Sequence, residues 1–135
     1  MSSKIIITPL ASINTEGGNV KHFLKANEDS FNGFGEAYFS FIEFGKIKAW
    51  KFHTKLTMNL VVPVGNVGFV FYDESNSSFN KYIIGESNYK RITVPPKIWF
   101  GFKGIGSRNN LVVNIADHNH DPSESMKKPI NFLKY

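Results

Sequence analysis

The sequence contains no cysteine, which excludes disulfides, thiolate metal sites and a cysteine nucleophile. The same absence suits a reducing compartment, so we expect a cytoplasmic protein. No apolar run approaches the roughly 20 residues that a membrane-spanning helix needs. The apolar segment 5–7 near the N-terminus is far too short for a signal peptide. We therefore expect no membrane partner.

The chain of 135 residues is expected to form a single domain, residues 1–135. Its net charge of +5 suits an anionic ligand such as a diphosphate. The basic residues are scattered along the chain, and a scattered basic surface is most often a solvated one. The hypothesis of a nucleic-acid binder would depend on net charge alone, because basic and aromatic residues do not interleave in a known pattern. We expect no nucleic-acid partner.

Aromatic residues are numerous, with 13 Phe, 5 Tyr and 2 Trp, and they favour strands. Many short apolar segments are separated by turn residues, and no helical stripe of useful length occurs, which predicts an all-β fold. A closed barrel or jelly roll would leave few exposed strand edges. The predicted strands cover residues 5–10, 20–24, 36–43, 47–52, 60–62, 67–72, 79–84, 89–94 and 111–116, and the block 92–102 is interpreted as the return side of the same barrel. The predicted turns include residues 12–14 and 63–66, and the tail 126–135 is expected to pack on the outside.

Two blocks of sequence carry a family resemblance. The first is Lys48-Ala49-Trp50-Lys51-Phe52-His53, and the second is Val94-Pro95-Pro96-Lys97-Ile98-Trp99-Phe100-Gly101-Phe102. They resemble the Trp-His-x-His (or Arg-Gly-x-His) and Ile-Pro-Pro-Gly-x-x-His-Gly-Phe patterns of the cupin-type sugar-nucleotide epimerases, typified by dTDP-4-dehydrorhamnose 3,5-epimerase. The resemblance runs from about Ile5 to Ile130. It implies a double-stranded β-helix, which is the cupin or jelly-roll barrel.

The resemblance also implies a function. Such a protein would epimerise or isomerise a nucleotide-linked 4-keto-6-deoxy sugar by proton transfer next to the ketone. It would need no cofactor, would serve surface polysaccharide biosynthesis, and would form a homodimer through strands of its N-terminal part. Lys51 and Phe100 stand where the family has histidines. This departure keeps open an alternative, a catalytically degenerate cupin that binds a sugar nucleotide or glycan without turnover.

The predicted catalytic residues are His53, Lys51 and His120. His53 lies two residues after Lys51, on the same face of a regular strand, and is the first choice for a general base. A histidine held by backbone hydrogen bonds near the loop is the other interpretation. Lys51 is a base if burial lowers its pKa, a cation for an enolate or phosphate, or a lysine extending to solvent. His120 falls where the family has an acid tyrosine, and Asp117 is placed to orient a histidine.

The predicted substrate-binding residues are polar or aromatic side chains expected near the mouth of the barrel. Lys48 stands in place of a substrate-holding arginine, and Phe100 either stacks on a sugar or base or packs in the core. The strand tyrosines Tyr38 and Tyr72 are interpreted as structural. The full predicted set is Lys48, Asn59, Arg91, Trp99, Phe100 and Asp117.

A metal site is not expected. The loop Asp117-His118-Asn119-His120-Asp121 has ligand types for zinc, nickel or manganese, but its spacing is not specific. In other cupins the metal is held by a His-x-His pair, a Glu and a later His. In this sequence only His53 remains of the three histidines. Lys51 stands at the position of the first histidine of the pair, and Phe100 stands at the position of the later one.

Overall fold

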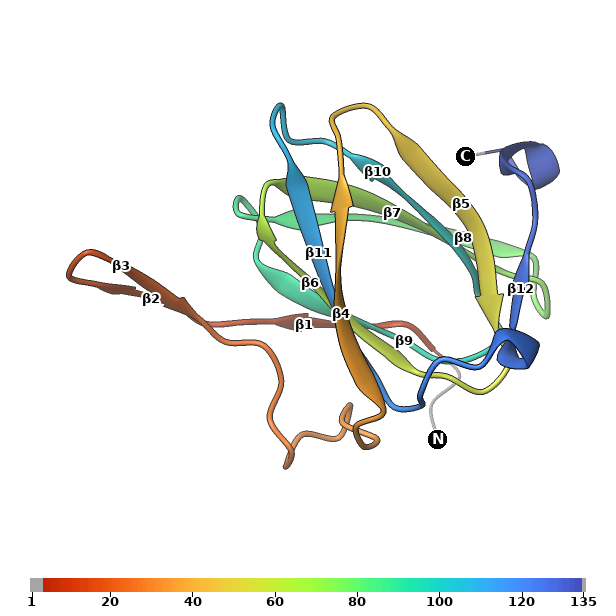
Figure 1. The fold of residues 1–135 in the computed structure, drawn as a ribbon, viewed down its shortest axis with the longest axis horizontal. Helices are drawn as coiled ribbons and strands as arrows, with labels where there is room; N and C mark the ends of the chain where they lie inside the picture. Colours follow the sequence, from red (N-terminus) through yellow and green to blue (C-terminus); the bar gives the residue numbers. More distant parts are fainter. Residues whose placement is uncertain (1–3, 135) are drawn as a thin grey trace.

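The computed structural model describes residues 4–134, which form an all-β fold with two short 3-10 helices (Figure 1). The strands of the body are β1 (Ile6–Pro9), β4 (Glu36–Ile42), β5 (Ile47–His53), β6 (Met58–Val64), β7 (Asn66–Asp73), β8 (Ser78–Gly85), β9 (Lys90–Val94), β10 (Trp99–Gly104), β11 (Asn110–Ala116) and β12 (Ser125–Lys127). Strands β2 (Ser12–Thr15) and β3 (Gly18–Lys21) form a separate hairpin. The 3-10 helices are η1 (Pro122–Glu124) and η2 (Ile130–Phe132). Within residues 4–134, no helix has the length and hydrophobicity needed to cross a membrane.

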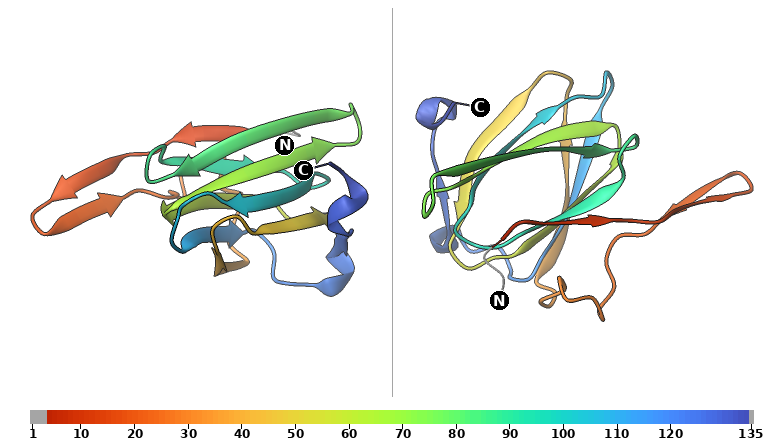
Figure 2. Two further views of the ribbon diagram at one scale, coloured as in Figure 1. Left: turned by 90° about the horizontal axis from the view of Figure 1, so that it is seen from above. Right: turned by 180° about the vertical axis from the view of Figure 1, so that it is seen from behind.

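Two five-stranded antiparallel sheets face each other and make up the body of the molecule (Figures 1 and 2). The first sheet has the order β1-β9-β6-β11-β4, and the second has the order β12-β5-β10-β7-β8. Neighbours in each sheet are mostly distant in sequence, because the chain passes repeatedly from one sheet to the other. This arrangement confirms the expected all-β jelly-roll fold of the cupin type.

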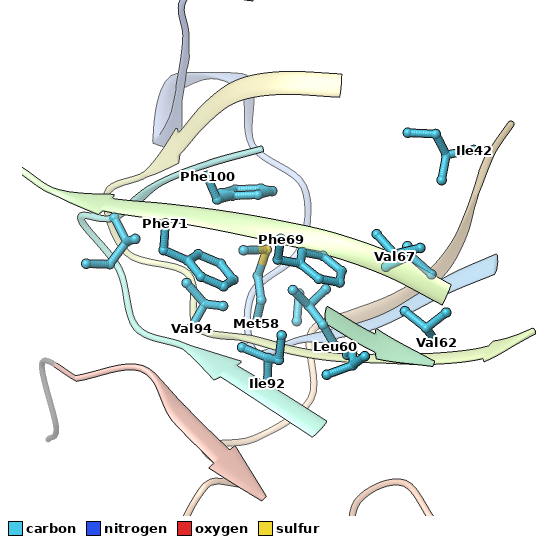
Figure 3. Packing of buried hydrophobic residues seen from close by; sticks show 14 of the residues in the cluster. Ile42, Met58, Leu60, Val62, Val67, Phe69, Phe71, Ile92, Val94 and Phe100 are labelled. Atoms are coloured by element: carbon cyan, nitrogen blue, oxygen red, sulfur yellow. The ribbon is translucent and has the colours of Figure 1, made fainter. Parts of the chain in front are cut away.

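The main core fills the space between the sheets, and Figure 3 shows its packing. Alternate residues of each strand point inward, as the period of a β-strand requires. The buried side chains include Met58, Leu60 and Val62 from β6, Ile92 and Val94 from β9, Phe69 and Phe71 from β7, and Phe100 from β10. Their alternation fixes the strand register, because a one-residue slip would turn these side chains to the solvent.

A second, smaller core lies on the outer face of the second sheet. Trp50, Val70 and Trp99 are buried there, and Leu133 of the C-terminal segment packs against them. The Trp50 indole Nε1–H donates to the carbonyl oxygens of Ile130 and Leu133, at 3.2 and 3.3 Å. The expectation that the tail 126–135 packs on the outside is therefore confirmed for residues up to 134, while Tyr135 lies outside the described residues.

Two predicted turns are strands in the structure. Residues 12–14 belong to β2, whose hairpin with β3 stands out from the body as an arm (Figures 1 and 2). Strand β6 continues to Val64, so the turn begins only at Gly65, which has φ 77°. Pro63 is tolerated because the register between β6 and β11 shifts at this point, and prolines are found at such irregularities.

Gly35 allows a close backbone contact at the start of β4. Its amide donates to the Ala116 carbonyl at 2.7 Å, and a Cβ atom here would lie 2.2–2.5 Å from backbone atoms of His118. We expect Gly35→Ala to lower the free energy of unfolding by about 1–3 kcal/mol in urea denaturation, because backbone must move to admit the methyl group. Gly18→Ala is the control, since nothing lies within 4 Å of a Cβ there, and equal losses for both variants would contradict the argument.

Candidate functional site

A cavity of about 310 Å³ opens between the two sheets. Its walls are largely apolar, three lysines contribute to it, and no carboxylate is among its lining residues. A mostly apolar pocket with a few polar groups is the usual form of a small-molecule site. The lining residues are Tyr38, Ser40, Lys48, Ala49, Trp50, Lys51, Met58, Leu60, Phe69, Phe100, Phe102, Val112, Asn114 and Lys127.

A β-bulge brings Lys48 and Lys51 to the same side of β5. In a regular strand, Lys48 and Lys51 would lie on opposite faces because they are three residues apart. The ladder between β5 and β10 instead shifts register, so that Lys51 lies opposite Phe100 and Lys48 lies opposite Phe102. Opposite residues of antiparallel strands share a face, and both phenylalanines pack in or against the main core. Both lysines therefore line the cavity, because bulges re-aim side chains.

Tyr38 and Asn114 lie on the neighbouring strands β4 and β11 and contribute polar atoms to the cavity. The Asn114 side-chain amide donates to the Tyr38 hydroxyl oxygen at 3.0 Å, so the phenolic proton is not used in this bond. Burial raises the pKa of Tyr38, and the bond from Asn114 offsets this only in part. The phenol is thus protonated at neutral pH and can donate. The Asn114 Oδ1 atom is buried without a hydrogen-bond partner among residues 4–134.

His53 and Glu124 form a buried pair beside the cavity. The Nδ1 atom of His53 lies 2.8 Å from Glu124 Oε1, and the two side chains are 8% and 7% exposed. The other carboxylate oxygen accepts from the backbone amides of Lys55 and Leu56 at 3.0 and 3.1 Å. Burial alone would raise the pKa of Glu124, but these hydrogen bonds outweigh it, so the pKa lies below its ordinary value. Glu124 therefore joins the C-terminal segment to the loop after β5.

The hydrogen bond to Glu124 decides the tautomer of His53. An ionised carboxylate only accepts, so the proton of the neutral imidazole lies on Nδ1 and the lone pair lies on Nε2. Burial lowers the pKa of His53 and outweighs the opposing effect of Glu124. Nε2 is buried and has no hydrogen-bond partner among residues 4–134. The imidazole ring stacks on Phe100, with centroids 5.9 Å apart, so a residue of the cavity wall packs against His53.

The buried pair of His53 and Glu124 predicts that the stability of the fold decreases at acidic pH. Unfolded His53 binds a proton near pH 6.5, whereas the folded imidazole does so only at lower pH. Its contribution to stability is complete above pH 6.5 and is lost as the pH falls toward the folded pKa. We expect the free energy of unfolding to decrease between pH 7 and 5, by at most about 1.4 kcal/mol per pH unit from this group. Urea denaturation at several pH values would measure it, and an unchanged slope in His53→Gln would contradict the assignment.

Asn59 and Arg91 are not at the mouth of the barrel. Both face outward from the first sheet and are buried beneath the loop 22–35. The Arg91 guanidinium donates to the Phe23 carbonyl at 2.7 Å, to Ser30 Oγ at 2.7 Å and to Glu28 at 3.0 and 3.3 Å. Asn59 donates to the Ser30 carbonyl at 3.1 Å. These residues hold the loop on the sheet, so the structure gives them no place in a substrate site at the cavity.

The remaining predicted residues also lie away from the cavity lining. Trp99 is buried in the outer core and donates its indole proton to Glu74. Asp117 accepts from the Thr57 amide at 2.8 Å and pairs with His118. His120 is exposed, and its backbone amide donates to Glu36. Among residues 4–134, no group of three or more His, Cys, Asp or Glu side chains is arranged to hold a metal ion.

Comparison with known proteins places this chain in a family. No protein-family model matches the chain. The crystal structure of a dTDP sugar isomerase from Desulfovibrio desulfuricans G20 is 34% identical and superposes with a TM-score of 0.89, covering 93% of this chain and 83% of that protein. The chain belongs to the cupin-type family of sugar-nucleotide epimerases and isomerases.

Two further proteins are similar to this chain, and they cover different shares of it. The probable low-salt glycan biosynthesis epimerase Agl13 of Haloferax volcanii is 30% identical over 91 residues, which are 63% of this chain and 58% of that protein. The chain thus spans less than two thirds of that relative's length. The dTDP-4-dehydrorhamnose 3,5-epimerase of Sulfolobus tokodaii is 17% identical with a TM-score of 0.82, over 97% of this chain and 80% of that protein, and shares the fold.

Four residues at or beside the cavity were not among the predicted site residues. Tyr38 was interpreted as structural, and Asn114, Glu124 and Lys127 were not predicted. Tyr38 could have been found from its position in an alternating strand, because Ser40 and Ile42 on the same face also point inward. No local pattern marks Glu124, which lies 71 residues from its partner His53.

Proposed function

We propose that the protein epimerises or isomerises a nucleotide-linked 4-keto-6-deoxy sugar by cofactor-free proton transfer next to the ketone. The observation that carries this proposal is a cavity combining three lysines with a protonated tyrosine, in a chain 34% identical to a dTDP sugar isomerase. The similarity to a glycan biosynthesis epimerase supports a role in making a surface polysaccharide. The absence of cysteine suits a cytoplasmic site of action.

The proton acceptor is His53 and the proton donor is Tyr38. A base near neutral pKa and a positioned acid are what removal and return of a proton next to a ketone require. His53 has its lone pair on Nε2, and Tyr38 has a free phenolic proton. Nε2 is buried, so access to it requires movement of the side chains that cover it. Tyr38 takes the role expected for His120, since His120 does not line the cavity.

Two of the cavity lysines supply the positive charge that the substrate and its enolate need. Lys48 and Lys127 line the cavity, and no carboxylate there competes for them. Lys48 is already oriented, because its Nζ donates to the Phe41 carbonyl at 2.9 Å. Preorganised cations in a largely apolar site stabilise developing negative charge more than they would in water. The buried Asn114 Oδ1, which has no partner within residues 4–134, is an acceptor for a sugar hydroxyl.

Deuterium exchange tests the proposal directly. The protein is incubated with dTDP-4-keto-6-deoxyglucose in heavy water, and NMR follows the protons on the ring carbons next to the ketone. We expect their replacement by deuterium at a rate far above the protein-free sample, together with an epimer or isomer as product. Absence of exchange would reject the catalytic role. Loss of exchange in His53→Ala, with the fold retained by circular dichroism, would assign the base.

A binding protein without turnover is the second candidate. The observation in its favour is that Nε2 of His53 is buried and that Phe100 stands where the family has a histidine. Titration calorimetry with dTDP and with the keto sugar distinguishes the two functions. Binding of both without deuterium exchange would favour this candidate, whereas exchange would remove it.

We also propose a homodimer. The arm of β2 and β3 extends from the body with Ile13 and Val20 about half exposed (Figure 1). On strand β4, Phe39 and Phe41 are 67% and 59% exposed on the same face. Adjacent exposed aromatics of this kind mark interaction surfaces. Sedimentation equilibrium should give twice the chain mass, and Phe39→Ser with Phe41→Ser should weaken association; a monomer at micromolar concentration would contradict the proposal.

A further inference from the structure

Lys51 stands in the cavity wall without an ionic partner. It lies opposite Phe100 in the ladder and lines the cavity together with Met58 and Leu60. None of the ion pairs within residues 4–134 includes Lys51. An ammonium group in largely apolar surroundings is costly unless it is paired. The surroundings of Lys51 therefore shift its equilibrium toward the neutral amine, compared with a lysine in water.

Burial is the largest cause of the lowered pKa of Lys51, and the nearby charges act in both directions. Burial lowers the pKa of Lys51, and the Lys127 ammonium lowers it further. Glu124 and Glu36 oppose this effect without cancelling it. A lysine that is desolvated beside a second cation is the known arrangement for an amine that attacks carbonyl groups.

We propose that Lys51 forms an imine with the ketone of the sugar substrate, which makes it a nucleophile of the reaction; this inference rests on the proposed function. The Nζ lone pair attacks the carbonyl carbon, and the carbonyl oxygen leaves as water after taking up two protons. The resulting iminium withdraws electrons from the neighbouring C–H bond, so a base removes that proton and an enamine forms. Reprotonation on the opposite face and addition of water then release the epimeric ketone and the free amine.

The other two lysines of the cavity are suited to hold anions instead. Lys48 is exposed and already donates to the Phe41 carbonyl. Lys127 is exposed on the short strand β12. Exposed lysines attract a diphosphate as compact point charges. Lys51 is thus the cavity lysine whose surroundings favour nucleophilic chemistry.

The imine predicts the type of product. Nitrogen remains bonded to the carbon that carried the ketone oxygen, so hydrolysis restores the ketone at the same carbon. A shift of the ketone to the next carbon would leave the sugar bound to Lys51 as a stable amine. The inference therefore predicts inversion next to the ketone and no migration of the ketone.

Trapping with sodium cyanoborohydride tests the imine. The full chain is mixed with dTDP-4-keto-6-deoxyglucose and the reductant, and intact mass with peptide mapping locates the adduct. We expect a covalent sugar adduct on Lys51, and exchange of the ketone oxygen with ¹⁸O-water faster than in the protein-free sample. Lys51→Arg keeps the charge and should lose the adduct and at least 100-fold of the deuterium exchange. Lys46→Arg, outside the cavity, should retain both.

The outcomes separate this inference from the proposed function. Deuterium exchange without an adduct on Lys51 and without accelerated ¹⁸O exchange would overturn the imine and leave the proton-transfer function intact. Full activity in Lys51→Arg would also overturn it, because a guanidinium supplies charge but does not form the imine. Absence of deuterium exchange in the unmodified protein would overturn both.

Discussion

Tyr38→Phe is expected to lower kcat for the epimerisation by about 10²- to 10⁴-fold, the usual contribution of a positioned general acid. The substitution removes the only proton that the ring can transfer and leaves the rest of the cavity wall in place. Because burial raises the pKa of Tyr38, the phenol holds its proton throughout the neutral range. Rapid-quench measurement of the sugar product, with KM determined in parallel, would show whether the loss lies in kcat.

The control for Tyr38→Phe is a tyrosine on the second sheet. Tyr72 packs against Phe79 at 4.5 Å between ring centroids and does not line the cavity, so Tyr72→Phe should leave kcat unchanged. Loss of the Tyr38 hydroxyl leaves the Asn114 amide without its acceptor and costs about 1 kcal/mol of stability. A kcat within a few fold of the unmodified protein would contradict the role of Tyr38 as the acid.

Local patterns were sufficient to predict most of the fold. Alternation and turn chemistry located the strands of the body apart from β12, because inward and outward residues alternate in most of them. In the arm, the predicted strand 20–24 overlaps only the end of β3, and β2 was missed, since these short strands are exposed and carry little apolar alternation. The register shift between Phe100 and Gly101 was also missed. A bulge adds one residue to a strand, and no periodicity in the strand itself reveals it.

The site was predicted less well, because it depends on which face of each strand is inside. Arg91 was assigned to the cavity although its neighbour Ile92 is an inward core residue, and adjacent strand residues point to opposite faces. That signal was present in the sequence. The role of Glu124 was beyond local reasoning, since η1 reaches His53 only after the whole barrel has formed.

The pair of Glu124 with His53 can be separated into a chemical and a structural contribution by two substitutions. In Glu124→Gln the amide oxygen still accepts from the Lys55 and Leu56 backbone, while the amide nitrogen donates to His53 Nδ1. The imidazole proton then moves to Nε2, and the lone pair that takes the substrate proton is lost. We expect kcat to fall by about 10²- to 10⁴-fold, as when the orienting carboxylate of a catalytic histidine becomes an amide. Stability should change by about 1 kcal/mol or less.

Glu124→Ala removes the acceptor as well as the charge. The buried amides of Lys55 and Leu56 and the His53 Nδ1–H all lose their partner, and each such donor costs about 1–3 kcal/mol when left unpaired. We expect the free energy of unfolding, measured in urea, to fall by about 3–5 kcal/mol, as when one member of a buried pair is deleted. Glu16→Gln, an exposed carboxylate in the arm, should leave both stability and kcat unchanged. If Glu124→Gln kept full activity, Glu124 would serve only to fasten the C-terminal segment, and the proton acceptor would have to be a group other than His53.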